Sequence, residues 1–237
     1  MRRYSTTLSL LLLLWIAQPG YAGETLRPFS ADYKLFEGGL HIANTNISLQ
    51  RDGELWLWRM AVKARGVYSL FTSKEPLAET TFSNGADGYR IHDILVSDGG
   101  DRGKDETAHF DWDNGKIDVR RKGKEKQLPL SEEIYDYQSI HVLAAALRRQ
   151  GIDKKVIEFY RKGRLRKSVL IDSGDGAVNL DGTKVPAYIF RQEITKSSST
   201  TYYFYDMENP ILPLRIEKHK SGESPSILLL QQVDWKQ

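Results

Sequence analysis

The 237-residue sequence contains no cysteine. This absence excludes disulfide bonds, thiolate chemistry and a lipid anchor attached to a cysteine. Small secreted domains commonly need disulfides, whereas a chain of this length can be stable on its hydrophobic core alone. The absence of cysteine is therefore compatible with export to an oxidising compartment.

A strong excess of charge is also absent. The formal net charge is +3, and it falls to +1 when residues 1–22, which contain Arg2 and Arg3 but no acidic residue, are removed. A general nucleic-acid-binding protein would show a strongly basic face. We therefore expect no nucleic-acid partner.

Motifs of hydrolases and metalloproteins are missing as well. The sequence has no Gly-x-Ser-x-Gly, His-Glu-x-x-His or Ser-x-x-Lys motif, and its five histidines are scattered without ligand spacing. The acidic residues between positions 98 and 113 lack the offsets and the closing glutamate of a calcium loop. We predict no catalytic residue, no metal site and no cofactor. An enzyme of unrecognised type is kept as a third alternative.

The N-terminal segment, residues 1–22, has the pattern of a secretory signal peptide. A basic start is followed by an apolar run over residues 8–17, by Pro19 and Gly20, and by a small residue at Ala22. The apolar run is shorter than the roughly 20 residues that a membrane-spanning helix needs. We expect cleavage near Ala22 and a soluble mature protein in the periplasm.

The strongest pattern in the remaining chain predicts one helix over residues 137–150. Ile140, Leu143 and Leu147 recur at helical spacing, and every other position between Ile140 and Leu147 except His141 is apolar too. A helix that is apolar nearly all round is normally buried. Asp136 is suited to accept backbone N–H groups at its start, and Gly151 is suited to the left-handed conformation at its end.

Strand patterns occupy the chain on both sides of this helix. About a dozen short strands follow one another at the spacing that is typical of sandwiches and barrels. A sheet of that many strands has to curl or close. We predict a single, mostly β domain over residues 23–237: a strongly curved antiparallel sheet, or half-open barrel, with one main buried helix. The expected strands span residues 29–36, 40–50, 55–64, 77–83, 89–97, 106–112, 116–121, 155–160, 165–171, 178–180, 185–195, 200–205, 214–218 and 227–235.

Three short motifs carry a resemblance to a known family. They are Phe29-x-Ala31-x-Tyr33, the helix entry Asp136-x-x-Ser139 that runs on to Leu147-Arg148, and Leu212-Pro213-Leu214-Arg215. In these motifs the chain resembles the exported Gram-negative proteins of domain of unknown function 3108, over nearly the whole mature sequence. Gln138 departs from the apolar residue expected before the helix serine.

The resemblance has limited implications for function. The family has no established activity, so no catalytic residue can be transferred to this sequence. Its expected shape, a curved antiparallel sheet with helical cover, is similar to that of periplasmic lipoprotein carriers and of their outer-membrane receptor. Such a likeness of fold does not by itself identify a function.

Aromatic side chains indicate a candidate ligand site. Each of them could simply fill the core, as most large apolar residues do. Collectively they could line a cleft between the sheet and the helix, because ligand pockets are concave and mostly apolar. Our leading hypothesis is a non-enzymatic carrier or chaperone for an apolar ligand, either a lipid or the acyl chains of a lipoprotein. The candidate ligand-binding residues are Trp56, Trp58, Tyr137, His141, Tyr203 and Tyr205.

Two predicted hairpin turns are rich in cations. Clustered lysines on turns commonly keep strand edges from aggregating. They can also contact anionic headgroups, where each cation gains about 1 kcal/mol. We therefore consider an anionic membrane surface as a partner. The alternative to a carrier is a structural or protein-interaction module of the cell envelope that uses an exposed strand edge. The cations concerned are Arg120, Arg121, Lys122, Arg161, Lys162 and Arg164.

Overall fold

The computed structural model describes residues 26–70, 74–85, 88–100 and 105–236. Within these residues the chain forms one 15-stranded sheet, one α-helix and one short 3₁₀ helix, η1 (Gly66–Leu70). The predicted signal peptide lies outside the described residues. The strands are β1 (Phe29–Glu37), β2 (Leu40–Asp52), β3 (Leu55–Ala64), β4 (Leu77–Gly85), β5 (Gly88–Ser97), β6 (Glu106–Asp111), β7 (Lys116–Arg121), β8 (Lys124–Pro129), β9 (Ile134–Tyr135), β10 (Lys154–Arg161), β11 (Arg164–Leu180), β12 (Thr183–Ile194), β13 (Ser199–Asp206), β14 (Pro213–Lys220) and β15 (Ser226–Trp235).

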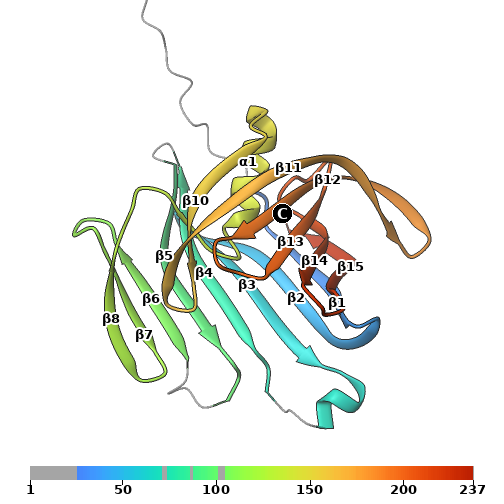
Figure 1. Cartoon of the computed structure of the whole chain (residues 1–237), viewed down its shortest axis with the longest axis horizontal. Coiled ribbons are helices and arrows are strands. Elements are labelled where there is room, and N and C mark those ends of the chain that lie inside the picture. The colour runs from blue at the N-terminus through green and yellow to red at the C-terminus, as the bar shows by residue number, and fades with distance from the viewer. Residues whose placement is uncertain (1–25, 71–73, 86–87, 101–104, 237) are drawn as a thin grey trace, which may run out of the picture.

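The order of strands follows the chain in two halves. From one edge to the other it is β8-β7-β6-β5-β4-β3-β2-β1-β15-β14-β13-β12-β11-β10-β9, so the first and last strands pair in the middle of the sheet (Figure 1). Neighbouring strands are antiparallel, except that the two residues of β9 run parallel to β10. In an antiparallel sheet of this kind, alternate connections lie at the same end of the strands.

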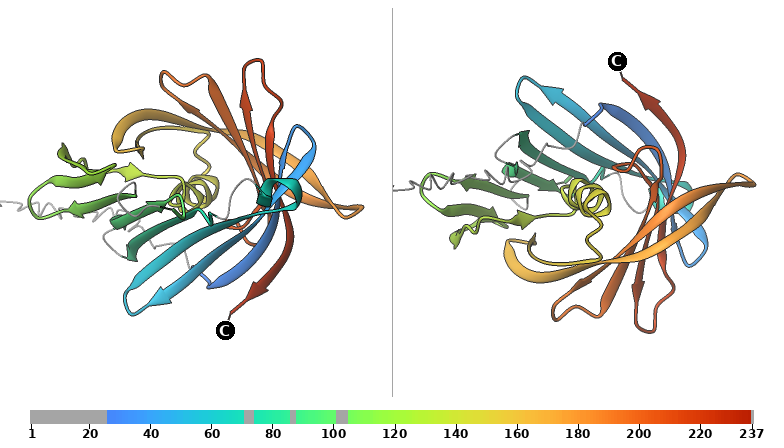
Figure 2. Two further views of the ribbon diagram at one scale, coloured as in Figure 1. Left: turned by 90° about the horizontal axis from the view of Figure 1, so that it is seen from below. Right: turned by 90° about the horizontal axis from the view of Figure 1, so that it is seen from above.

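The sheet curves around α1 (Ile140–Gln150), which lies inside the curve in the views of Figure 2. In the described part of the chain, the two edges of the sheet do not pair with each other. They meet through side chains: Tyr160 of β10 packs against Phe110 of β6 with ring centroids 5.8 Å apart, in a cluster that also contains Ile94 and Val119. The predicted fold class, a strongly curved antiparallel sheet around one buried helix, is confirmed.

The start of α1 is held by a reciprocal pair of hydrogen bonds. Asp136 Oδ1 accepts the backbone N–H groups of Gln138 (3.2 Å) and Ser139 (2.8 Å), and Ser139 Oγ accepts the Asp136 N–H (2.7 Å). This is the geometry of a capping box, and it satisfies donors that the helix itself leaves free. Residues 137–139 form a turn within this pair, so the regular helix begins at Ile140, three residues later than the sequence predicted.

The end of α1 is closed by the glycine that the sequence predicted. Gly151 has a φ of 63°. Its N–H bonds the carbonyl of Arg148, and the N–H of Ile152 bonds the carbonyl of Leu147. This is the Schellman arrangement, in which a left-handed residue lets the chain turn away from the helix.

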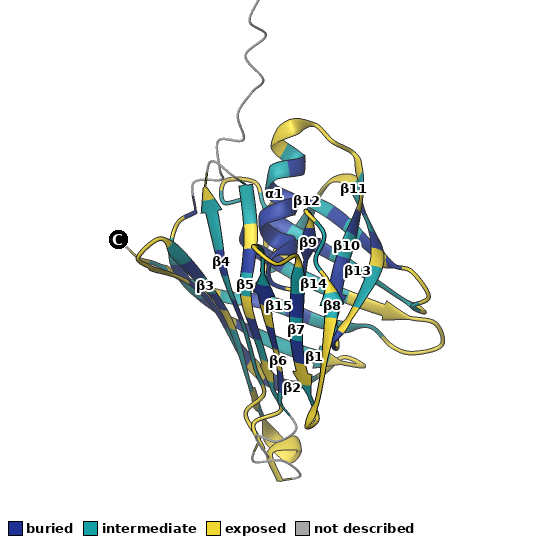
Figure 3. Cartoon of the chain, turned by 90° about the vertical axis from the view of Figure 1, so that its left-hand side faces the viewer, coloured by how far each residue is buried: buried dark blue, intermediate teal, exposed yellow. Residues whose placement is uncertain are grey.

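Strands from both halves of the curved sheet pack their inner face against α1, which explains why the helix is apolar nearly all round. Val142 and Ala145 belong to a cluster formed mainly by β1, β2, β3, β14 and β15. Ile140, Leu143 and Leu147 belong to a second cluster formed mainly by β10, β12 and β13. The helix is consequently buried along most of its length (Figure 3).

The sequence pattern did not predict β8 and β9, and it divided β11. β8 is an edge strand whose residues are exposed or half-buried, so it has no apolar alternation to detect. β9 is only two residues long. β11 joins the predicted strands 165–171 and 178–180 through a bulge between Asp172 and Asp175, where Gly174 has a φ of 84°.

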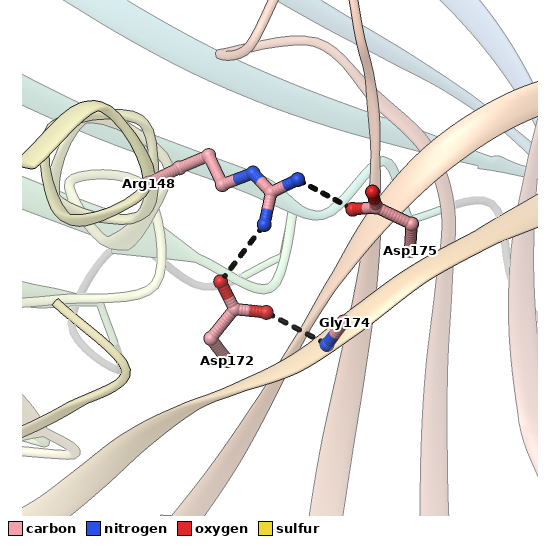
Figure 4. Close-up of polar contacts among 4 residues, drawn as sticks. All are labelled: Arg148, Asp172, Gly174 and Asp175. Carbon is pink, nitrogen blue, oxygen red and sulfur yellow. Dashed lines mark hydrogen bonds and ion pairs between the residues drawn. The ribbon is translucent and has the colours of Figure 1, made fainter. Parts of the chain in front are cut away.

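This bulge in β11 is also an anchor for the helix. Arg148 Nη1 lies 3.3 Å from Asp172 Oδ2, and Nη2 lies 2.5 Å from Asp175 Oδ1 (Figure 4). The other oxygen of Asp172 accepts the N–H of Gly174 at 2.7 Å. The guanidinium carbon lies 5.7 Å from the ring centroid of Tyr188. Arg148 therefore ties the last turn of α1 to both β11 and β12.

We expect Arg148→Met to lower the free energy of unfolding by about 1 kcal/mol, because the ion pairs form a network but are partly screened by solvent. A double-mutant cycle with Asp172→Asn, measured by chemical unfolding, should give a coupling energy of about 0.5 kcal/mol or more. Arg149→Met, at an exposed position of the same turn, is the control and should have a smaller effect. Additive effects in the cycle would contradict the proposed anchor.

Candidate functional site

A pocket of about 420 Å³ lies between the N-terminal end of α1 and the inner face of the sheet. Its volume falls in the range of ligand-binding pockets in proteins. Most of its wall is apolar. The lining residues are Leu35, Ile47, Trp58, Met60, Ala78, Ile94, Val96, Glu106, Asp136, Tyr137, Gln138, His141, Tyr160, Arg161, Lys162, Thr201, Tyr203, Ile216, Lys218, Ser226 and Leu228.

The apolar wall is built from rows of directly opposed residues on neighbouring strands. One row crosses β13, β14, β15 and β1 and consists of Tyr203, Ile216, Leu228 and Leu35. A second row crosses β3, β4 and β5 and consists of Met60, Ala78 and Val96. Because side chains alternate between the two faces of a strand, opposed partners point to the same face and form a continuous surface.

The pocket opens at the end of the strands that carries the β5–β6, β10–β11 and β14–β15 connections. Val96 at the end of β5 and Lys218 near the end of β14 line it there, together with Lys162 in the β10–β11 turn. Val96 on the inner face of β5 is 42% exposed, and Tyr137 in the turn before α1 is 39% exposed, although large apolar side chains are usually buried. The apolar interior is therefore accessible from outside.

His141 forms part of the inner end of the pocket. It is buried, its ring stacks on Trp58 with centroids 4.8 Å apart, and Nδ1 lies 2.9 Å from the hydroxyl of Tyr205. Burial lowers the pKa of His141 from 6.5 to about 3, because the imidazolium form would be removed from water. Burial also raises the pKa values of Tyr203 and Tyr205. These polar groups are consequently neutral at pH 7.

Asp136 is the buried carboxyl group beside the helix entry. Thr80 Oγ1 donates a hydrogen bond to Asp136 Oδ2 at 2.5 Å, in addition to the two backbone donors at Oδ1. Burial raises the pKa of Asp136, and these hydrogen bonds oppose that rise. The contacts of Asp136 link the start of α1 to β4, so this carboxyl group has a structural task.

The two basic hairpin turns meet near the mouth of the pocket. Each turn is a two-residue turn with positive φ at both positions: Lys122 and Gly123 between β7 and β8, and Lys162 and Gly163 between β10 and β11. Glu106 joins them, because its carboxylate contacts Arg121 Nε at 2.6 Å and accepts the N–H of Gly163 at 2.8 Å.

The structure brings together four of the six residues predicted to bind a ligand. Trp58, Tyr137, His141 and Tyr203 line the pocket, whereas Trp56 and Tyr205 do not. Tyr205 is completely buried beside His141, and Trp56 is packed in the core opposite Phe82 of β4. Sequence reasoning missed the aliphatic wall and Lys218. Alternation along the strands places Leu35, Met60, Ile216 and Leu228 on the inner face, so the pattern carried that information.

A larger hollow of about 860 Å³ lies on the opposite face of β4–β8. Its lining includes Glu79, Asp93, His109, Asp118 and Arg120, which alternate with the inward-facing residues of the same strands. Polar residues are expected on the solvent face of a sheet. We therefore treat the inner pocket as the candidate site.

Two further features are missing from the described residues. They contain no group of three histidine or acidic side chains that could hold a metal ion. None of their helices is long and apolar enough to cross a bilayer.

A family model for proteins of unknown function, DUF3108, matches residues 29–221. The chain belongs to this family. The resemblance inferred from the three short motifs is thereby confirmed. No curated protein sequence matches the chain.

Among solved structures, the chain is similar to a β-barrel-like protein of domain of unknown function DUF1849 from Brucella abortus. The TM-score is 0.60 at 12% sequence identity, over 89% of this chain and 98% of that chain. The likeness concerns the fold alone. Proteins from Bacteroides fragilis, with a YmcC-like fold, and from Parabacteroides distasonis align with TM-scores of 0.34. Their identities are 8% and 10%, over 88% of this chain and 96% of each of theirs.

We expect the stability of the protein to fall at acidic pH partly because of His141. In the unfolded chain this group is protonated below about 6.5, whereas in the folded protein it stays neutral down to about 3. Its contribution is therefore complete above pH 6.5 and is lost as the pH falls, by about 1.4 kcal/mol per pH unit. Chemical unfolding at several pH values should show a shallower loss in His141→Asn, whose amide can replace Nδ1. Equal slopes in both proteins would contradict this assignment.

Asp136 should have the opposite pH dependence. Its folded pKa is raised, so the charged form is disfavoured in the folded state and the group destabilises the protein above that pKa. Asp136→Asn keeps an acceptor for the helix cap and removes the charge, so we expect it to be at least as stable as the parent protein at pH 8. Asp136→Ala removes the cap as well and should lose about 2 kcal/mol. A large loss in Asp136→Asn would show that the charge itself is needed.

Proposed function

We propose that this protein is a non-catalytic binding protein that holds an apolar ligand, a lipid or the acyl chain of a lipoprotein, between α1 and the sheet. The observation that carries the proposal is the open pocket of about 420 Å³ with a mostly apolar wall. His141 at its inner end is neutral and buried, and it is hydrogen-bonded to Tyr205. Such a wall favours the burial of hydrocarbon.

Hydrocarbon burial would provide sufficient affinity without a specific polar site. Each buried methylene contributes about 0.8 kcal/mol, so roughly ten of them contribute about 8 kcal/mol before ordering costs are subtracted. A free energy of that size corresponds to a dissociation constant of about 1 μM, which is the tightest binding that ten methylenes would give before those costs.

We further propose that the protein acts in the periplasm. The signal-peptide pattern of residues 1–22 supports this proposal, and the absence of cysteine is compatible with it. The cations of the two hairpin turns would then face anionic headgroups. Lys122, Lys162 and Arg164 are exposed on the turns, whereas the charge of Arg121 is already engaged by Glu106.

The alternative function, a protein-interaction module that uses a strand edge, finds less support. β8 is an exposed edge strand, but it presents Lys124, Glu125 and Lys126. Charged residues on an edge are a common protection against strand addition. An open apolar pocket is not needed by such a module.

Extraction of lipid from natively purified protein, followed by mass spectrometry, tests the proposal. We expect bound lipid in the parent protein and uptake of a fluorescent fatty acid after delipidation. Ala78→Trp, which fills one wall of the pocket, should weaken uptake by about tenfold or more. Thr81→Trp lies on the outer face of the same strand and is the matched control, which should bind as the parent does. A lipid-free protein that takes up no fatty acid would overturn the proposal.

A further inference from the structure

Three cations line the mouth of the apolar pocket: Arg161 and Lys162 at the β10–β11 turn, and Lys218 on β14. No ion pair with an acidic side chain is formed by any of them within the described ranges 26–70, 74–85, 88–100 and 105–236. Arg161 lies over the ring of Tyr137, with its guanidinium carbon 5.7 Å from the centroid. The mouth therefore concentrates positive charge beside hydrocarbon.

The acidic groups near these cations do not neutralise them. Glu106 lines the pocket, but its carboxylate is engaged by Arg121 and by the N–H of Gly163. Asp136 lies at the inner end, where it caps α1. Burial, followed by repulsion from Arg161 and Lys162, lowers the pKa of Lys218. Glu37 attracts the charged form of Lys218, but this attraction is weaker than those effects. A bound anion would relieve this repulsion.

The apolar wall leads directly to these charges. On β14, Ile216 and Lys218 are two residues apart and lie on the same face of the strand. The ammonium group of Lys218 therefore adjoins the apolar wall at Ile216. Ile216 continues across the sheet into Leu228 and Leu35. A hydrocarbon chain that lies along this row would place its head group at Lys218.

We propose that the ligand of the pocket is an anionic amphiphile, whose carboxylate or phosphate head is bound by Arg161, Lys162 and Lys218 while its chain lies along Ile216, Leu228 and Leu35. This inference rests on the proposed function and specifies the ligand class for the same site. Arginine binds carboxylate and phosphate oxygens in a bidentate manner, and lysine contributes a point charge. Hydrogen bonds between ions of this kind are about twice as strong as those between neutral groups.

Binding of three ligands with the same hydrocarbon chain tests the inference: dodecanoate, dodecyl phosphate and dodecanol, each below its micelle concentration. We expect the two anions to bind the delipidated protein about tenfold or more tightly than dodecanol, measured by displacement of a fluorescent probe. Arg161→Gln, Lys162→Gln and Lys218→Gln should each reduce this preference, and the triple variant should abolish it. Arg164→Gln removes a cation from the same turn that does not line the pocket, and it should keep the preference.

The possible outcomes separate the two proposals. Equal binding of dodecanol and the anions would overturn the headgroup assignment and leave the apolar pocket supported. Binding of none of the three would overturn both. A preference for anions that survives in the triple variant would show that these cations do not bind the head group. When both anions are preferred, the tighter one identifies carboxylate or phosphate as the natural chemistry. The preference should also weaken at high salt.

Discussion

The fold depends on the burial of a helix that has almost no polar surface. α1 contains seven alanine and branched aliphatic residues in its first eight positions, and only its last turn is charged. Such a helix is stable in water only when protein surrounds it. A flat sheet can cover one side of a helix, so the sheet has to bend around it, and the clusters on both sides of α1 are the consequence.

The pocket follows from a difference in length between the helix and the strands. A helix of 11 residues extends about 16 Å, whereas a strand of 10 residues, such as β3, extends about 33 Å. The helix therefore fills only part of the space that the curved sheet encloses. Beyond its first turn, the inner face continues with apolar side chains such as Leu35 and Met60, which line open space instead of a second helix.

The polar groups of this region divide between structure and exposed charge. Asp136, Ser139 and Thr80 hold the helix entry against β4. Glu106 joins the β7–β8 and β10–β11 turns, which lie near opposite edges of the sheet. This contact brings Arg161 and Lys162 to the mouth of the pocket. The same contact supports the meeting of the two sheet edges, which have no hydrogen-bonded pairing in the described part of the chain.

The sequence by itself determined the local structure: the helix with its caps at Asp136 and Gly151, the glycine turns and most of the strands. These features depend on residues close together in the chain. Strands without an apolar face, such as β8, left no pattern. Only the tertiary structure decided which aromatic residues line the pocket, because Trp56 and Trp58 have the same alternation and differ only in what lies opposite them. It also decided that the two basic turns meet, since Glu106 is separated from Gly163 by 57 positions and no local pattern encodes such a contact.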